Sequence, residues 1–169
     1  MSKKDRLRHI VPAPAPAPIP LLEFTTTLEF PAQPRFAAAA RLVVDTSDRT
    51  KLKIAFLSPE LLSWFGGLIE EAVGPVELKI SRLIRRARDE RIRQELGGPE
   101  RERIYFSQAL AYLATADQSG WHVFYILDSS GVLRAVSAGW SGDGWGLRAG
   151  SVGPSVDWRG GVHFVSRNS

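Results

Sequence analysis

The first reaction type that the residues suggest is hydrolysis by a catalytic triad. An aspartate, a histidine and a serine follow one another near the C-terminal end. Asp157, His163 and Ser166 would supply an orienting acid, a general base and a nucleophile. However, His163 and Ser166 lie three positions apart in a stretch with strand character, and an odd step puts side chains on opposite faces of a strand. We therefore predict no catalytic residue in this chain.

The sequence also indicates no metal or cofactor site. The chain has no cysteine, which excludes a thiolate zinc site, a disulfide framework and a cysteine nucleophile. No acidic residue stands at a zinc-like spacing from His122 or His163. The glycines between Gly139 and Gly146 belong to a predicted hairpin with no helix start after it, so they form no phosphate-binding loop. We predict neither a metal nor a cofactor.

Basic residues are concentrated in two stretches of the chain, whose formal net charge is +4. Residues 1–9 hold four bases and one acid, a net +3, and residues 77–103 hold nine bases and six acids, again +3. The spacing of apolar residues such as Ile80, Leu83 and Ile84 predicts a helix over 76–96 in the second stretch. The other face of this helix would carry Lys79, Arg82, Arg85, Arg86, Arg88, Arg91 and Arg93.

Opposite charges in the predicted basic helix are repeatedly spaced four residues apart, so they can neutralise one another within the helix. These pairs are Arg85 and Asp89, Arg86 and Glu90, Asp89 and Arg93, and Arg91 and Glu95. The basic face is therefore open to three interpretations: a solvated self-paired surface, a surface for phosphate groups, or a surface for a protein partner.

Two β-hairpins are predicted in the C-terminal part, where turn-forming residues separate aromatic and β-branched runs. If Leu127 opposes Val132 and Trp140 opposes Trp145, one face of the hairpins is a core face. The opposite face then carries the candidate binding residues, which are His122, Phe124, Gly139 and Arg148. Because small residues make this face shallow, it is either the seat of another part of the chain or a binding surface.

The rest of the chain alternates strand and helix signals. Strands are predicted over 21–30 and 162–166, a hairpin over 41–57, and helices over 58–74 and 100–116 in addition to 76–96. Ser58 and Pro59 form a typical helix start. We therefore predict an α+β fold: a C-terminal antiparallel β-meander of about four strands, with an N-terminal β-hairpin and two to three packed helices.

Residues 1–20 are predicted to be a disordered, basic and Pro/Ala-rich tail, and residues 21–169 a single domain. Alternating proline and alanine over 12–18 favour an extended spacer. No apolar run approaches the roughly 18 residues of a membrane span. The charged N-terminal residues are followed by this spacer and not by an apolar signal core. We therefore expect a cytoplasmic protein with no membrane partner.

Several short motifs lie along the chain from residue 52 onward: Leu52-Lys-Ile, Leu57-Ser, Trp64-Phe-Gly-Gly, Glu70-Glu71, Glu95-Leu-Gly-Gly, Phe124-Tyr-Ile, Gly131-Val-Leu-Arg-Ala-Val, Gly142-Asp-Gly-Trp, Trp158-Arg-Gly-Gly and Ser166-Arg-Asn-Ser. Together they resemble a family of short uncharacterised bacterial proteins. The resemblance spans roughly residues 40–169, is strongest at the C-terminal end, and leaves the Pro/Ala tail outside. It implies one recurring domain and assigns no activity.

Three functions are compatible with the sequence. The first is a non-catalytic interaction module that binds an unknown protein or peptide through the face around His122, Phe124, Gly139 and Arg148. The alternative is a nucleic-acid-binding protein, in which the tail and the basic helix contact phosphates and Phe124 or Trp158 stacks on bases. In that case the contacts come from Lys79, Arg82, Arg85, Arg86, Arg88 and Arg93. An enzyme that uses scattered acids is the least favoured.

Overall fold

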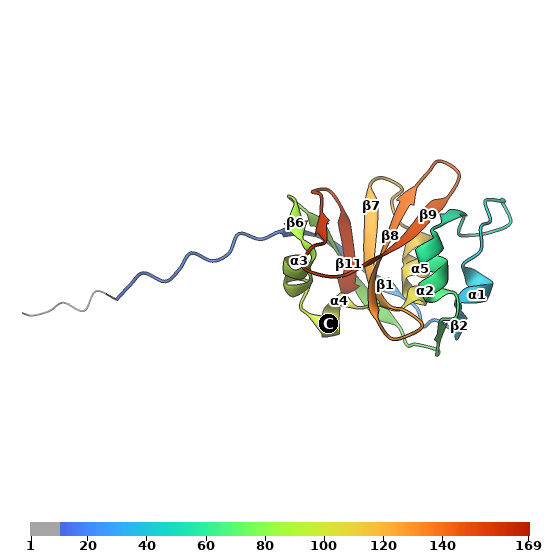
Figure 1. Ribbon diagram of the computed structural model, residues 1–169, viewed down its shortest axis with the longest axis horizontal. Coiled ribbons are helices and arrows are strands. Elements are labelled where there is room, and N and C mark those ends of the chain that lie inside the picture. The colour runs from blue at the N-terminus through green and yellow to red at the C-terminus, as the bar shows by residue number, and fades with distance from the viewer. Residues whose placement is uncertain (1–10) are drawn as a thin grey trace, which may run out of the picture.

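A seven-stranded mixed sheet forms the centre of the protein. The computed structural model describes residues 11–169 (Figure 1). In spatial order the strands are β1 (Leu22–Phe30), β5 (Val76–Leu83), β11 (His163–Arg167), β7 (Trp121–Leu127), β8 (Leu133–Trp140), β9 (Trp145–Ser151) and β3 (Ile54–Leu57). Neighbouring strands are antiparallel except in the pairs β11–β7 and β3–β9, which are parallel. The predicted α+β class is confirmed.

Shorter elements surround this sheet. The helices are α1 (Ala38–Arg41), α2 (Pro59–Phe65), α3 (Asp89–Glu95), α4 (Pro99–Glu102) and α5 (Phe106–Leu113). The remaining strands form two small ladders, in which β2 (Phe36–Ala37) pairs with β4 (Ile69–Glu70) and β6 (Ala87–Arg88) pairs with β10 (Asp157–Trp158). Residues 11–20 are exposed and have no regular structure. The basic tip of the predicted tail, residues 3–8, lies outside the described residues.

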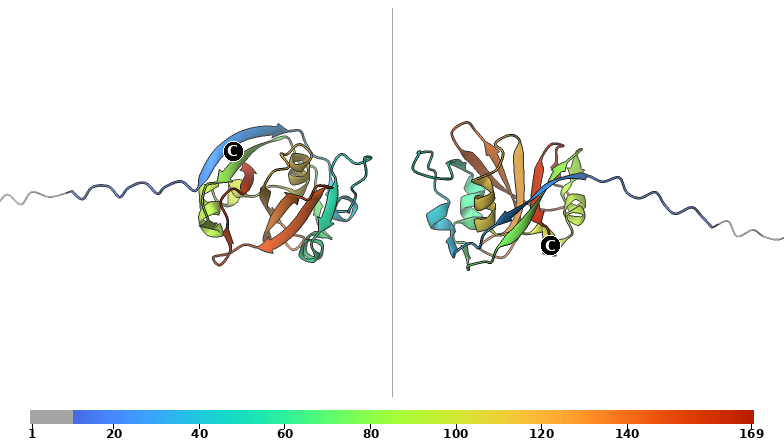
Figure 2. Two further views of the ribbon diagram at one scale, coloured as in Figure 1. Left: turned by 90° about the horizontal axis from the view of Figure 1, so that it is seen from above. Right: turned by 180° about the vertical axis from the view of Figure 1, so that it is seen from behind.

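The sheet curves around α5, as the view from above shows (Figure 2, left). The larger core fills this concave side, where Phe106 and Leu110 of α5 pack with Phe124 of β7 and Val136 of β8. A second core on the other side of the sheet contains Tyr125, Phe164 and Ile92 of α3. The strands β7 and β11 are therefore covered on both faces.

The register of the first hairpin differs from the prediction. Leu127 pairs with Leu133, so Val132 belongs to the connection and not to the strand. Asp128 and Val132 close a three-residue loop, and Gly131 in that loop has a φ of 79°, which favours glycine. The predicted pairing of Trp140 with Trp145 is confirmed. Because one pairing is shifted by one residue and the other is not, the predicted faces are mixed.

The predicted meander and N-terminal hairpin are wrong in their pairing. Only β7, β8 and β9 form an antiparallel meander, and the last strand, β11, lies between β5 and β7. No hairpin forms over 41–57, since β3 joins the sheet edge parallel to β9 and Asp45 makes only an isolated bridge to Ile54. The N-terminal strand β1 instead pairs with β5.

The predicted basic helix over 76–96 is also wrong. Its first half is the strand β5, in which Leu78 and Ile80 alternate toward the larger core, and only Asp89–Glu95 is helical. The helix predicted over 58–74 ends at Phe65, before the two glycines. The helix predicted over 100–116 is divided in two, because Ile104 donates its N–H to the carbonyl of Tyr125 in the sheet.

Candidate functional site

The four predicted binding residues do not form one surface. His122 and Phe124 lie on the concave side of the sheet and are 1% and 0% exposed, whereas Gly139 and Arg148 lie on the opposite side. The ring of Trp121 covers Gly139, where an added Cβ would lie 2.9 Å from the ring. The guanidinium of Arg148 lies 4.7 Å from the ring centre of Phe56. The surface that we predicted from the sequence therefore does not exist in that form.

His122 occupies a buried aromatic cluster. Its Nε2 lies 2.8 Å from the carbonyl oxygen of Asp117 and its Nδ1 lies 2.9 Å from the hydroxyl of Tyr112. Because a carbonyl only accepts, Nε2 donates. The tyrosine hydroxyl can donate or accept, and burial favours the neutral ring, in which Nδ1 accepts from that hydroxyl. Burial lowers the pKa of His122 and is only partly opposed by the bond to Asp117. His163 stacks on this ring with the centroids 5.2 Å apart.

The residues of the hypothetical triad are separated. His163 and Ser166 lie on opposite faces of β11, and Asp157 on β10 accepts two hydrogen bonds from the guanidinium of Arg86. Among residues 11–169, no group of three or more histidine and acidic side chains has the geometry of a metal site. Within the same range, no helix is long and apolar enough to cross a membrane.

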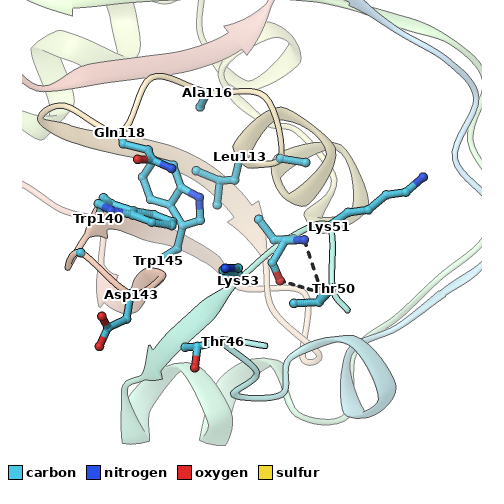
Figure 3. Close-up of a pocket in the computed structure, with 13 residues that line it drawn as sticks. Thr46, Thr50, Lys51, Lys53, Leu113, Ala116, Gln118, Trp140, Asp143 and Trp145 are labelled. Atoms are coloured by element: carbon cyan, nitrogen blue, oxygen red, sulfur yellow. Dashed lines mark hydrogen bonds between the residues drawn. The ribbon is translucent and has the colours of Figure 1, made fainter. Parts of the chain in front are cut away.

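A pocket of about 490 Å³ opens at the turn between β8 and β9, and we call it the tryptophan pocket (Figure 3). Trp140 and Trp145 flank this turn, with their ring centroids 5.5 Å apart and their planes at 78°. Figure 3 shows the two indole rings beside Gln118 and Leu113. The pocket is lined by Thr46, Thr50, Lys51, Leu52, Lys53, Leu113, Ala114, Ala116, Gln118, Trp140, Gly142, Asp143 and Trp145.

The lining divides into an apolar floor and a polar rim. Trp145 and Leu113 are buried, whereas Thr46, Gln118 and Asp143 are exposed. Trp140 is half-buried, so one part of its ring packs and another part faces the opening. This combination of apolar depth and polar margin is typical of ligand pockets and of the centres of protein interfaces.

Segments far apart in the sequence hold the tryptophan pocket together. The N–H of Trp145 donates to the carbonyl of Lys53 over 2.8 Å, which ties the hairpin to the segment before β3. Leu113 comes from α5, whose first turn is anchored by Glu70: its carboxylate accepts the N–H groups of Phe106 and Ser107 at 2.7 and 3.0 Å. Burial raises the pKa of Glu70, and these two bonds oppose the increase.

Sequence reasoning missed the tryptophan pocket as a site. The sequence signal was the pair Trp140 and Trp145 on either side of a turn, which we assigned to a core face. The contribution of Lys53, Leu113 and Gln118 had no local signal, because these residues come from separate elements that only the sheet topology brings together.

The residues of the predicted basic helix are distributed over different surroundings. Lys79 lies over the ring of Phe24 on the sheet, Arg82 pairs with Glu23, and Arg93 pairs with the buried Glu102. In contrast, Arg85, Arg86, Arg88 and Arg91 line one pocket. None of the four predicted pairs at a spacing of four residues forms in the described part of the chain.

Comparison with known family models, with curated proteins and with solved structures finds no match. A function for this chain is therefore argued from its own residues and their geometry.

Proposed function

We propose that this protein is a non-catalytic interaction module that binds a segment of a protein or peptide partner in the tryptophan pocket. The observation that carries this proposal is the placement of Trp140, half-exposed, over a floor formed by the buried Trp145 and Leu113. Tryptophan is enriched among the residues that contribute most to binding at protein interfaces. An apolar side chain of the partner would pack on the exposed part of the Trp140 ring.

The rim of the pocket suits a peptide backbone. A peptide presents both donors and acceptors, and the rim offers both kinds through Gln118, Asp143 and Lys53. Burying one large apolar side chain contributes at most about 1.5 to 3 kcal/mol, so contact with the half-exposed Trp140 supplies affinity and the rim supplies orientation. No histidine, cysteine or serine lines the pocket within the described residues. The pocket is therefore proposed to bind and not to catalyse.

A displayed library of random peptides, selected on the full chain, tests the proposal. The best peptides should bind with at least about ten-fold lower affinity to Trp140→Ala, because removing an interface tryptophan commonly costs more than 2 kcal/mol. The titration can be followed by calorimetry. Trp121→Ala is the matched control, since Trp121 is also partly exposed but lies outside the pocket.

The control decides the outcome. The proposal requires that Trp121→Ala retains the affinity of the unmodified chain. It is wrong if the library gives no binder, or if the selected peptides bind equally well to the Trp140 and Trp121 variants.

A further inference from the structure

Four arginines line a second pocket, of about 370 Å³, in a different part of the sheet. Arg85 and Arg86 follow β5, Arg88 lies in β6 and Arg91 lies in α3. All four side chains belong to exposed residues. Leu21, Ala87 and Asp157 complete the lining. We call these seven residues the arginine corner.

Most of the positive charge in the arginine corner is not neutralised. Asp157 pairs with Arg86 over 2.6 Å, and an Arg85 nitrogen lies 3.3 Å from the carbonyl oxygen of Ile19. Neither Arg88 nor Arg91 forms an ion pair within residues 11–169. Four arginines and one aspartate leave a net charge of +3 in the corner.

Two of the three acids that could have paired with these arginines are used elsewhere, and the third, Glu90, is exposed and forms no ion pair within residues 11–169. Asp89 is fully buried, and its Oδ1 accepts hydrogen bonds from the Tyr125 hydroxyl at 2.5 Å and from the Trp158 indole at 3.0 Å. The carboxylate of Glu95 accepts the backbone N–H groups of Leu21 and Leu22. Asp89 and Glu95 therefore do not pair with Arg85 and Arg91, which remain exposed.

The corner is held in place before any ligand binds. The ladder of β6 with β10 pairs Arg88 with Asp157, and the N–H of Asp89 donates to Val156 over 2.9 Å. At Gly160, an added Cβ would lie 3.2 Å from the Cα of Arg85, so the two backbones are in close contact. A preorganised site loses less conformational entropy when it binds.

The proline-rich segment 11–20 joins the body of the protein at the same corner. Leu21 is held there by Glu95, and residues 11–20 extend away from it in Figure 1. In an extended polyproline conformation these ten residues span roughly 30 Å. The spacer itself carries no charged residue, so the positive charge of the corner comes from its own arginines.

We propose that the arginine corner binds the phosphodiester backbone of a nucleic-acid strand. The four basic residues of the corner are all arginine, whose planar guanidinium binds phosphate oxygens in bidentate fashion. A strand supplies phosphates at regular intervals, so neighbouring phosphates can contact different guanidinium groups of the corner. This binding site lies outside the tryptophan pocket and does not depend on the peptide proposal.

Fluorescence anisotropy with labelled oligouridylate and oligothymidylate strands of about 20 nucleotides, over a series of salt concentrations, tests the proposal. Reversing three charges with Arg85→Glu, Arg88→Glu and Arg91→Glu should lower the affinity at least about ten-fold at low salt. It should also flatten the slope of log K against log salt by about 2, since each phosphate contact on a single strand contributes about 0.7.

The matched control changes the net charge by the same amount elsewhere. Arg35→Glu, Arg49→Glu and Arg148→Glu replace three exposed arginines outside the corner. This variant should retain the salt slope of the unmodified chain. Circular dichroism and urea denaturation verify that each variant is folded. If the corner triple variant is unfolded, Arg88→Glu compared with Arg49→Glu provides the same test with a smaller fold-change.

Three results would overturn the proposal. The first is no binding to either strand at about 50 mM salt, where phosphate contacts are strong. The second is an equal loss of affinity in the corner variant and in the control. The third is tighter, corner-dependent binding to polyglutamate or to vesicles that contain phosphatidylserine, which would assign the corner to an acidic protein or to a membrane surface.

Discussion

His122 joins Tyr112, Trp145 and His163 in a cluster at the beginning of β7. The ring is 1% exposed and hydrogen-bonded at both nitrogens, so its neutral form fits the fold. A proton added at Nδ1 would turn this acceptor into a donor facing the Tyr112 hydroxyl, in a region that excludes water. At the residue scale, His122 therefore links the stability of the fold to pH.

The sign of this pH dependence follows from the lowered pKa of His122, whose largest cause is burial. In the unfolded chain, His122 takes up a proton near its ordinary pKa of 6.5. In the folded protein, His122 takes up a proton only at a lower pH. The contribution of the neutral His122 ring to the free energy of unfolding is therefore complete above pH 6.5. It is lost as the pH falls from 6.5 through the lower pKa of the folded protein. We expect the free energy of unfolding to decrease by up to about 1.4 kcal/mol per pH unit below 6.5 because of this group.

Urea denaturation at pH 7.5 and 5.5 measures this effect. His122→Gln keeps a donor and an acceptor and cannot titrate, so its free energy of unfolding should fall less between the two pH values. The difference from the unmodified chain is the quantity of interest, since other groups titrate equally in both proteins. Equal slopes for the variant and the unmodified chain would contradict the assignment of His122 as a buried neutral ring.

At the scale of elements, Gly160 fixes the approach of the chain to the end of β5. The N–H of Gly161 donates to the carbonyl of Leu83 over 2.7 Å, and the N–H of Leu83 donates to Val162 over 2.8 Å. These bonds leave little room for the backbone to move away from a new methyl group at position 160. We therefore expect Gly160→Ala to lower the free energy of unfolding by about 1 to 3 kcal/mol through overpacking.

Gly150→Ala is the control for this prediction. An added Cβ at Gly150 has no neighbour within 4 Å and its φ is not in the left-handed region. The free energy of unfolding should change by less than about 1 kcal/mol, because alanine mainly restricts the unfolded chain. Urea denaturation measures the free energy of unfolding of both variants. A Gly160 variant as stable as the Gly150 variant would show that the Arg85 backbone can shift freely.

Local chemistry was enough to predict some of these elements. The strand over 21–30 and the strand over 162–166 are found as β1 and β11 within one or two residues. The helix start at Ser58 is also confirmed, because the Ser58 hydroxyl accepts the N–H of Leu61. In these segments the side-chain pattern and the capping residue agree with the tertiary contacts that the segments make.

Other elements depend on contacts that the sequence does not show. Ile80, Leu83 and Ile84 fit a helical stripe, but residues 76–83 lie between β1 and β11 and form a strand. Both patterns are compatible with these residues, and pairing on two sides selects the strand. Similarly, the carboxylate of Asp128 accepts the N–H groups of Ser130 and Val132, which fixes a three-residue loop and shifts the register by one position. That shift separated the predicted binding residues.

At the scale of the whole molecule, the two proposed sites are separated by the sheet. The arginine corner follows β5, the tryptophan pocket lies at the turn between β8 and β9, and the strands β11 and β7 lie between β5 and β8. Figure 1 shows β6 and α3 at one end of the sheet and β9 toward the other. Within the part of the chain that the structure describes, no residue lines both pockets. The structure therefore offers two contacts that a peptide and a nucleic-acid strand could occupy at the same time.

This separation predicts that the two binding activities are independent. The free-energy effects of substitutions at distant sites without shared partners usually add to within about 0.5 kcal/mol. Trp140→Ala should therefore leave oligonucleotide affinity within about two-fold, and the triple reversal at Arg85, Arg88 and Arg91 should leave peptide affinity equally unchanged. A variant that combines both sets of substitutions should lose both activities by the sum of the separate effects.

A thermodynamic cycle with both ligands on the full chain measures the coupling directly. Anisotropy titrations with the oligonucleotide are made without peptide and at saturating peptide, for the unmodified chain and for each variant. A coupling free energy near zero agrees with two separate, independent sites. A coupling above about 1 kcal/mol would contradict their independence, and the oligonucleotide would then change the peptide affinity by the same factor.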